Sequence, residues 1–216
     1  MKSVLITGGT VRLGKAIAER LRAEGWRVIT SSHRADAGAD IVADLAEPMG
    51  AAKLYAAALQ LLGGLPPDAL VNNAALFTGD EAAIAAVNLE APKKLTMMMA
   101  GREAGVGAVV NVLDAKASDG SRRQSAAAVG YRKSKQALAE FTKTSAATFA
   151  ATLRVNGVAP GPVMAPTEVH ERAGEMLLDR RPTADDVAAA VSYLLGAEAT
   201  TGAIIPVDAG QHLVAQ

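Results

Sequence analysis

The fold is decided by residues 3–14, which read Ser3-Val4-Leu5-Ile6-Thr7-Gly8-Gly9-Thr10-Val11-Arg12-Leu13-Gly14. The apolar run Ser3–Thr7 predicts a buried strand, the glycines predict a tight turn, and a helical pattern begins at Leu13. Backbone N–H groups in such a turn, with the positive end of the helix dipole behind them, favour a bound anion. The stretch therefore predicts a site for the pyrophosphate of a dinucleotide, although a glycine-rich turn also occurs for purely structural reasons.

Short apolar runs alternate with longer helical patterns along the whole chain. We expect strands at Ser3–Thr7, Arg27–Ser32, Asp40–Ala43, Ala69–Asn72, Ala108–Leu113, Arg154–Val158 and Ile204–Val207. We expect helices at Leu13–Glu24, Met49–Leu62, Glu81–Ala104, Ala126–Ala151, Glu168–Leu178 and Ala184–Leu195. Gly25 is placed to end the first helix, and Thr183 with Asp186 resembles a capping box for the last. This order predicts a doubly wound α/β fold with a seven-stranded parallel sheet and helices on both faces.

Composition narrows the class of protein. With 216 residues, half of them apolar, the chain is long enough for one domain, residues 1–216. Its 22 basic and 22 acidic residues balance, which indicates neither a nucleic acid nor a membrane as a partner. There is no cysteine, and His33, His170 and His212 lack the spacing of metal ligands, so we expect no metal. No charged or apolar leader precedes the first strand, and we expect a cytoplasmic protein.

A tyrosine and a lysine stand four residues apart in Tyr131-Arg132-Lys133-Ser134-Lys135. Because this segment has a helical pattern, both side chains lie on one helix face, one turn apart. A cation near a tyrosine lowers the pKa of the phenol from about 10 toward working pH, so the pair is a candidate acid/base device. A solvated, basic helix surface is the alternative interpretation.

The end of the second strand indicates which dinucleotide is bound. An enzyme that uses NAD usually carries an acidic residue there, whereas this chain has Ser32, His33 and Arg34. Hydroxyl groups and the forked donors of an arginine suit the additional 2′-phosphate of NADP. A basic surface loop is the alternative. Asp44 and Leu45, after the third strand, are candidates to bracket the adenine, although an aspartate at a strand end also forms turns.

These features together resemble the short-chain dehydrogenase/reductase family over nearly the whole chain. The matching positions are Thr7-Gly8…Gly14, Asn72-Asn73-Ala74, Asn88, Tyr131…Lys135, Pro160-Gly161 and Val207-Asp208-Ala209-Gly210. The resemblance implies a Rossmann fold and hydride transfer with a nicotinamide cofactor. It also implies that Tyr131 is the acid/base, that Lys135 binds the nicotinamide ribose, and that Asn88 holds a water in the proton relay.

The resemblance extends to the residues expected to contact the cofactor. Asn73 and Ala74 would line the cofactor cleft, and Pro160 and Gly161 would border the nicotinamide. The full expected set is Gly8, Arg12, Leu13, Gly14, Ser32, His33, Arg34, Asp44, Leu45, Asn73, Ala74, Lys135, Pro160 and Gly161.

Two departures from the usual family pattern resemble the pteridine reductase branch, which includes dihydromonapterin reductases. Arg12 stands where most members have glycine, and Asp114 follows the fifth strand where most have serine. In that branch the arginine reaches toward pyrophosphate and substrate, and the aspartate hydrogen-bonds the pterin or relays a proton. Phe77 lies where the branch places an aromatic ring that stacks on the pterin; core packing is the alternative for this side chain.

Ser118 competes with Asp114 for the position of the usual catalytic serine. It lies thirteen residues before Tyr131, the usual separation in the family, whereas Asp114 lies at the expected distance after the strand. The end of a strand fixes a catalytic group more firmly than a loop, which accepts insertions, so we favour Asp114.

The resulting hypothesis is an NADPH-dependent reductase that transfers hydride to a dihydropterin or related pteridine. The expected catalytic residues are Tyr131, Lys135, Asp114 and Asn88, and the expected substrate-binding residues are Phe77, Arg12 and Asp114. One alternative is an NADPH-dependent carbonyl or 3-oxoacyl reductase, and another is an inactive nucleotide-binding or scaffold protein. Members of the family commonly assemble through two long helices, so the resemblance also implies a homo-oligomer, either a dimer or a tetramer, and the helices expected at Glu81–Ala104 and Ala126–Ala151 are suited to such packing.

Overall fold

A computed structural model describes residues 1–103, 105–115, 126–163 and 176–214. Its seven strands form one sheet in the order β3-β2-β1-β4-β5-β6-β7, and every neighbouring pair is parallel. The strands are β1 (Ser3–Thr7), β2 (Arg27–Ser32), β3 (Ile41–Val42), β4 (Ala69–Asn72), β5 (Gly107–Val112), β6 (Leu153–Pro160) and β7 (Ile204–Val207). This arrangement confirms the predicted doubly wound α/β fold.

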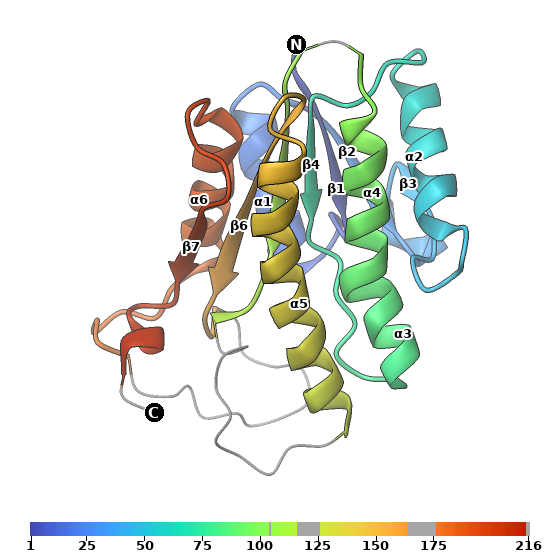
Figure 1. Ribbon diagram of the computed structural model, residues 1–216. Coiled ribbons are helices and arrows are strands. Elements are labelled where there is room, and N and C mark those ends of the chain that lie inside the picture. Colours follow the sequence, from blue (N-terminus) through green and yellow to red (C-terminus); the bar gives the residue numbers. More distant parts are fainter. Residues whose placement is uncertain (104, 116–125, 164–175, 215–216) are drawn as a thin grey trace.

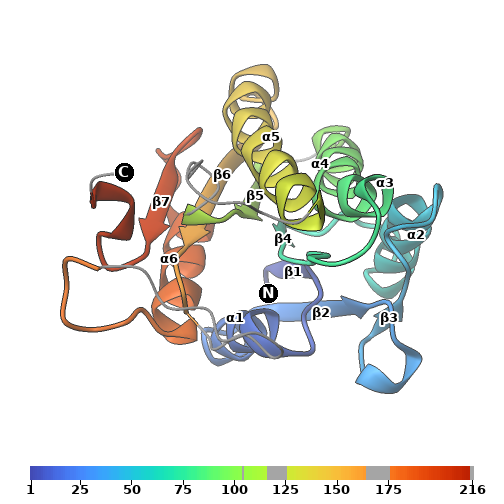
Figure 2. The same ribbon diagram turned by 90° about the horizontal axis from the view of Figure 1, so that it is seen from below.

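Helices cover both faces of the sheet (Figures 1 and 2). They are α1 (Arg12–Ala23), α2 (Gly50–Leu61), α3 (Glu81–Ala85), α4 (Ala91–Ala100), α5 (Ala126–Thr148) and α6 (Ala184–Gly196). A π-helical turn, Ala86–Glu90, joins α3 to α4, and short 3₁₀ turns occupy Ala35–Ala37 and Gln211–Leu213. Figure 2 shows α1 and α6 on one side of the sheet and α2, α4 and α5 on the other.

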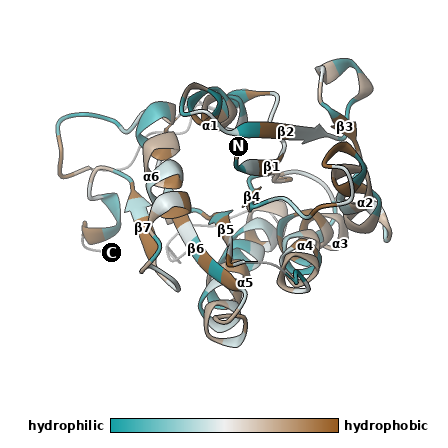
Figure 3. Ribbon diagram, turned by 90° about the horizontal axis from the view of Figure 1, so that it is seen from above, coloured by the Kyte–Doolittle hydropathy of each residue, from teal (hydrophilic) through white to brown (hydrophobic). Residues whose placement is uncertain are grey.

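The sheet separates two hydrophobic cores because successive side chains of a strand point to opposite faces. Val4 and Ile6 of β1 pack with residues of α1 and α6, whereas Leu5 packs with residues of α2 and α4. Burial on both faces explains why β1 is an uninterrupted apolar run. Figure 3 shows that the helices carry both hydrophobic and hydrophilic residues along their length, as expected for elements with one buried and one solvent-facing side.

The strands β1, β2, β4 and β7 have the predicted bounds, and most of the other elements differ from the prediction by one to three residues at an end. The third strand is shorter than the expected Asp40–Ala43, and the expected helix Glu81–Ala104 is interrupted by the π-helical turn and ends at Ala100. The expected helix Glu168–Leu178 lies mostly outside the described residues, and its last three positions are not helical. Thr183 and Asp186 form the predicted capping box, and Gly25 has the positive φ of +86° expected just beyond a helix end.

The described residues contain neither a membrane-spanning helix nor a cluster of metal-binding side chains. None of their helices is both long and apolar enough to cross a bilayer. They also contain no group of three or more histidine and carboxylate side chains arranged to hold a metal ion.

Candidate active site

The candidate site lies at the carboxyl ends of the central strands. The strand order reverses between β1 and β4, and parallel α/β sheets bind ligands in the crevice at such a reversal. The glycine-rich turn follows β1, Asn73 follows β4, Asp114 follows β5, and Gly161 follows β6. Residues far apart in the sequence therefore meet at one edge of the sheet.

Asn73 ties the glycine-rich turn to the neighbouring strand. Its Nδ2 donates to the backbone oxygens of Thr7 and Gly8, each at 3.0 Å, and its backbone N donates to Thr7 Oγ1 at 3.0 Å. The backbone N of Ala74 donates to the same hydroxyl at 3.0 Å. Asn73 and Ala74 thus hold the shape of the turn, a role that sequence reasoning did not assign to them.

The turn is packed so closely that it requires glycine. A Cβ at Gly14 would overlap the backbone oxygen of Gly8 and lie 2.5 Å from Asn73 Nδ2. Gly8 has a φ of +63°, in the left-handed region that glycine enters without a steric cost. These constraints form a cradle of backbone at the N-terminus of α1, where an anion is favoured.

Arg12 adopts an unusual backbone conformation in this cradle. Its φ is +48°, and a side chain in the left-handed region costs about 1–2 kcal/mol. The resemblance places glycine at this position in most of the family, and the positive φ supplies a physical reason for that preference. Arg12 is exposed at the first residue of α1, whereas the neighbouring Leu13 is partly buried against the core.

The loop after β2 contains an ion pair that sequence reasoning missed. Arg34 Nε donates to Asp36 Oδ1 at 3.0 Å, and Arg34 Nη2 donates to Asp36 Oδ2 at 2.7 Å. The hydrogen bond to the carboxylate and its charge raise the pKa of Arg34, and the same contacts lower the pKa of Asp36. Ser32 Oγ accepts from the backbone N of Arg34 at 3.1 Å, and His33 is exposed.

The segment after β3 has a mainly structural geometry. Asp44 is exposed, and its Oδ1 accepts from the backbone N of Ala46 at 2.9 Å, which forms the turn considered as the alternative for this residue. The side chain of Leu45 is only 8% exposed and packs in the core, so a ligand contact through that side chain is not available in this structure.

Tyr131 and Asp114 meet directly at the carboxyl end of β5. Tyr131 Oη donates to Asp114 Oδ2 at 3.1 Å. The Nζ of Lys135 lies 5.8 Å from the centre of the Tyr131 ring, within the range of a cation–π contact. A phenol, a carboxyl group and an ammonium group are therefore assembled within one small region, which is a set of groups able to hold and move a proton.

Lys135 reaches this region from inside the protein. Its side chain is 3% exposed, and its Nζ donates to the backbone oxygen of Val112 at 2.7 Å. Burial lowers the pKa of Lys135 from 10.5 to about 8, against a smaller opposing effect of the Asp114 charge. A lysine buried to this extent is not part of a solvated helix face, and the structure contradicts that alternative for Lys135.

Asn88 fastens the loop after β4 to α5. Its Oδ1 accepts from the backbone N of Leu76 at 2.7 Å, and its Nδ2 donates to the backbone oxygen of Leu76 at 2.9 Å and to Ser134 Oγ at 3.2 Å. Ser134 Oγ in turn donates to the backbone oxygen of Tyr131 at 2.6 Å. Both N–H groups of the Asn88 amide are thus used within the protein.

Ser134 was not singled out from the sequence. It lies three residues after Tyr131, at a spacing that places both residues on one helix face, which was the available signal.

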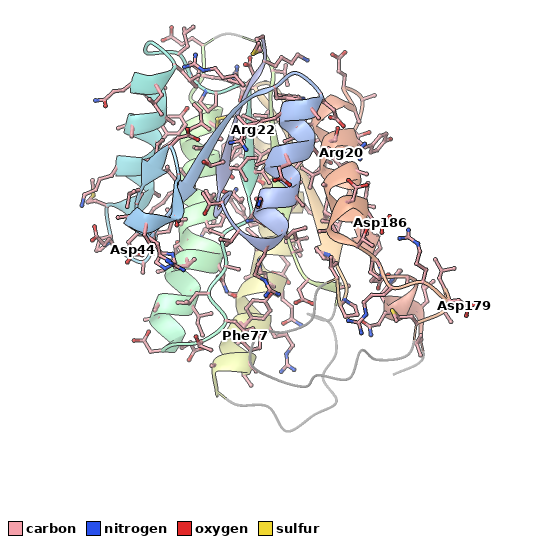
Figure 4. The ribbon with its side chains drawn as sticks, turned by 180° about the vertical axis from the view of Figure 1, so that it is seen from behind. Arg20, Arg22, Asp44, Phe77, Asp179 and Asp186 are labelled. Atoms are coloured by element: carbon pink, nitrogen blue, oxygen red, sulfur yellow. The ribbon has the colours of Figure 1, made fainter. Side chains whose placement is uncertain are left out.

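Phe77 lies at the edge of this region and not in the core. The ring is 51% exposed, and its centre lies 4.9 Å from that of Tyr131 with the two planes inclined by 59°. Figure 4 shows Phe77 beside the N-terminal part of α5. An exposed aromatic ring next to the phenol is available to a planar ligand, whereas the alternative of core packing is wrong.

Pro160 is the last residue of β6, and Gly161, which follows it, lies close to the chain beyond β7. The backbone N of Gly161 donates to the backbone oxygen of Val207 at 3.0 Å. A Cβ at Gly161 would lie 2.6 Å from the Cβ of Asp208, so a larger residue does not fit here. Ser118, the competitor of Asp114, lies outside the described residues.

The chain is similar to several known proteins. A family model described as short chain dehydrogenase matches residues 2–176. A putative ketoacyl reductase 2 of the granaticin polyketide synthase of Streptomyces violaceoruber is 31% identical, over 97% of this chain and 96% of its own length. Pteridine reductase 1 of Leishmania tarentolae is 29% identical, over 97% of this chain and 96% of its own length.

A solved structure is also similar. FolM alternative dihydrofolate reductase 1 from Brucella canis, crystallised with NADP, superposes with a TM-score of 0.85 at 31% identity. The match covers 100% of this chain and 96% of that protein.

Proposed function

Since this chain belongs to the short chain dehydrogenase family, we propose that it is an NADPH-dependent reductase of a dihydropterin or a closely related pteridine. The chain is an oxidoreductase that uses NADP. The observation that carries the finer proposal is the contact between Tyr131 and Asp114, with the exposed ring of Phe77 against the tyrosine.

The residues around the glycine-rich turn fit a dinucleotide. The turn at Gly8 and Gly14 has no room for a side chain at Gly14, so its backbone is exposed to a ligand without a side chain in between. Its N–H groups lie at a helix N-terminus, where a pyrophosphate is favoured. Arg34 and Ser32 would hold the 2′-phosphate, Asn73 and Ala74 would support the cleft, and Gly161 would border the nicotinamide. NADPH supplies the hydride when it is bound.

The chain's own residues handle the proton. In our proposal Tyr131 gives a proton to the substrate, and Asp114 accepts the hydrogen bond of the phenol and contacts the pteridine. Lys135, buried beside the ring, supplies the positive charge that makes the phenol a stronger acid. Asn88 holds the Leu76–Phe77 segment directly, and it holds Tyr131 through Ser134, whose hydroxyl donates to the Tyr131 backbone oxygen.

A pteridine fits this arrangement because it is planar, aromatic in part and rich in N–H donors. The exposed face of Phe77 offers a stacking surface, and the carboxyl group of Asp114 accepts hydrogen bonds from ring N–H or amino groups. Protonation of an imine nitrogen also demands less of a phenol than stabilisation of an alkoxide does. The similarity to a pteridine reductase and to a dihydrofolate reductase of this family supports the same substrate class.

A carbonyl or 3-oxoacyl reductase is the second candidate. The similarity to a putative ketoacyl reductase favours it, since Tyr131 and Lys135 would serve a ketone equally well. Asp114 and Phe77 have no evident use with such a substrate, and for this reason we prefer the pteridine.

A steady-state assay distinguishes these candidates. Oxidation of NADPH is followed with dihydrobiopterin, dihydromonapterin and dihydrofolate on one side, and with a panel of ketones and 3-oxoacyl thioesters on the other. We expect a kcat/KM for at least one dihydropterin about tenfold or more above that for every ketone. Activity with ketones alone would reject the pteridine proposal, and tight NADPH binding without any turnover would indicate a protein that has lost its chemistry.

Assembly into a homo-oligomer is part of the proposal. β7 is an edge strand, and Tyr193 of α6 beside it is 61% exposed; Met97 of α4 is 50% exposed. Light scattering on the purified protein tests this, because a mass of 22.1 kDa would show a monomer and contradict the expectation of a dimer or tetramer.

A further inference from the structure

We propose that Asn72, Asn111 and Thr142 form a hydrogen-bonded chain that sets the position of α5 on the sheet. Asn72 Nδ2 donates to Asn111 Oδ1 at 2.8 Å, and Asn111 Nδ2 donates to Thr142 Oγ1 at 2.9 Å. Thr142 Oγ1 then donates to the backbone oxygen of Leu138 at 2.7 Å. These are positioning residues, because they act on the reaction only through Tyr131 and Lys135.

This series of hydrogen bonds runs from β4 to β5 and ends on α5. Asn72 of β4 and Asn111 of β5 are register partners, so their side chains lie side by side on one face of the sheet. Thr142 lies on α5, which covers that face. Asn72 is 2% exposed, and the other two are 0% exposed, so water does not compete for these hydrogen bonds.

A second polar contact joins the same helix to the same strand. Lys135 Nζ donates to the backbone oxygen of Val112, the residue after Asn111. Lys135 and Thr142 are seven residues apart, which is two helical turns, so both project from one face of α5. Two such attachments, one on each side of Leu138, fix both the translation of α5 along its axis and its rotation.

Apolar packing alone would leave this position less defined. Leu138 and Ala146 bury apolar surface between α5 and the sheet, but hydrophobic contacts are not directional, and small residues allow a helix to slide. These hydrogen-bonded residues also cost free energy of folding, since three polar side chains are desolvated. Asn72 Oδ1 has no hydrogen-bond partner among the described residues. Buried polar groups of this kind can specify one arrangement where an apolar core would permit several.

The consequence concerns the catalytic geometry. Tyr131 lies one turn before Lys135 on the same helix, so a shift or rotation of α5 moves the phenol relative to Asp114 on β5's carboxyl end. A misplacement near 1 Å at a reacting group lowers turnover by up to about a hundredfold. Loss of the Thr142 hydroxyl should therefore reduce kcat more than it reduces cofactor binding.

The test compares Thr142→Val, which keeps the shape and removes the hydroxyl, with Thr142→Ser, which keeps the hydroxyl. Thr144→Val is the matched control, because Thr144 is exposed and its Oγ1 donates to the backbone oxygens of Glu140 and Phe141, both within α5. We expect Thr142→Val to lower kcat about tenfold with the KM for NADPH changed by less than about twofold. Thr142→Ser and Thr144→Val should stay close to the parent protein.

Hydrogen exchange gives a readout that does not need activity. The activity measurement rests on the proposed function, whereas amide exchange in residues 127–142 reports the attachment of α5 directly. We expect faster exchange there in Thr142→Val than in Thr144→Val. A Thr142→Val protein with a lower melting temperature but parent-like kcat and exchange in α5 would overturn the inference. If the parent reduces no substrate, the proposed function fails, and the exchange result alone decides this inference.

Discussion

Tyr131 Oη donates a hydrogen bond to Asp114 Oδ2 across 3.1 Å, and this contact joins α5 to the loop that follows β5. The two residues are 17 positions apart in the sequence. Each is held by an element that packs on the sheet, so their relationship follows from the fold. It places a carboxyl group where it can influence every proton that the phenol gains or loses.

The division of labour between these two residues can be tested by substitution. Tyr131→Phe should lower kcat by about 10²- to 10⁴-fold with any substrate, because it removes the proton donor. Asp114→Ala should lower the turnover of a dihydropterin by at least about tenfold and affect a ketone less, because the carboxyl group contacts the pteridine. If Asp114→Ala left pterin turnover unchanged while Tyr131→Phe abolished it, the role proposed for Asp114 would be wrong.

The buried lysine predicts the alkaline limit of activity. The pKa of Lys135 is lowered to about 8, so its positive charge is present below that pH and is lost above it. We expect kcat/KM, which reports ionisations of the free enzyme, to fall above pH about 8. The exposed Lys133 is the matched control, and Lys133→Met should keep the same profile. An unchanged kcat/KM up to pH 10 would contradict the assignment.

The same lysine predicts how stability varies with pH. Its pKa is lower in the folded protein than the ordinary 10.5, so the unfolded chain binds more protons between pH 8 and 10.5, and stability rises with pH in that window. Below pH 8 the charged, buried group costs about 3 kcal/mol. In urea unfolding, Lys135→Met should gain most over the parent below pH 8, and this gain should shrink as pH approaches 10.5. A pH-independent difference would refute the prediction.

Cofactor preference should depend on the Arg34–Asp36 pair. We expect the parent to bind NADPH at least about tenfold more tightly than NADH, and Arg34→Ala to erode this difference. Asp36→Asn should have the opposite effect, because it frees the guanidinium group and removes a negative charge near the 2′-phosphate. Fluorescence titration with both cofactors measures these affinities, and equal affinities in the parent protein would defeat the prediction.

The positive φ of Arg12 predicts an unusual order of stabilities. Arg12→Gly should be more stable than Arg12→Ala by about 1 kcal/mol, because alanine keeps the Cβ that opposes the left-handed conformation. The exposed Lys15, later in α1, is the control: there Lys15→Ala should be more stable than Lys15→Gly by about 1 kcal/mol, as is usual inside a helix. Chemical unfolding of the four variants provides the comparison, and the same order at both positions would show that Arg12 is not strained.

Much of the fold follows from the sequence because hydrophobic patterning is local. The apolar run Val4, Leu5 and Ile6 predicts a strand buried on both faces, and in the structure these residues lie in two hydrophobic cores. The meeting of Tyr131 with Asp114 was also accessible, since β5 and α5 were both predicted and the ends of parallel strands share one edge of the sheet.

Other features of the site depend on contacts that no local pattern records. The amide of Asn88 binds the Leu76 backbone and Ser134, and neither partner is adjacent to it in the sequence. The Arg34–Asp36 pair is different, because its partners are two positions apart at the 3₁₀ turn Ala35–Ala37, and sequence reasoning missed it although the contact is local. Leu45 was a candidate to bracket the adenine, and the structure shows that its side chain packs in the core.

The π-helical turn Ala86–Glu90 amounts to one residue inserted into an otherwise α-helical rod. Each residue of an α-helix turns the chain by about 100°, so α3 and α4 differ in rotational phase by about that angle relative to an unbroken helix. Asn88 lies within this π-helical turn, where the rotational phase changes. Shortening this turn by one residue would restore a regular helix and rotate α3 about its axis by about 100°, so that a different face of α3 would meet α5.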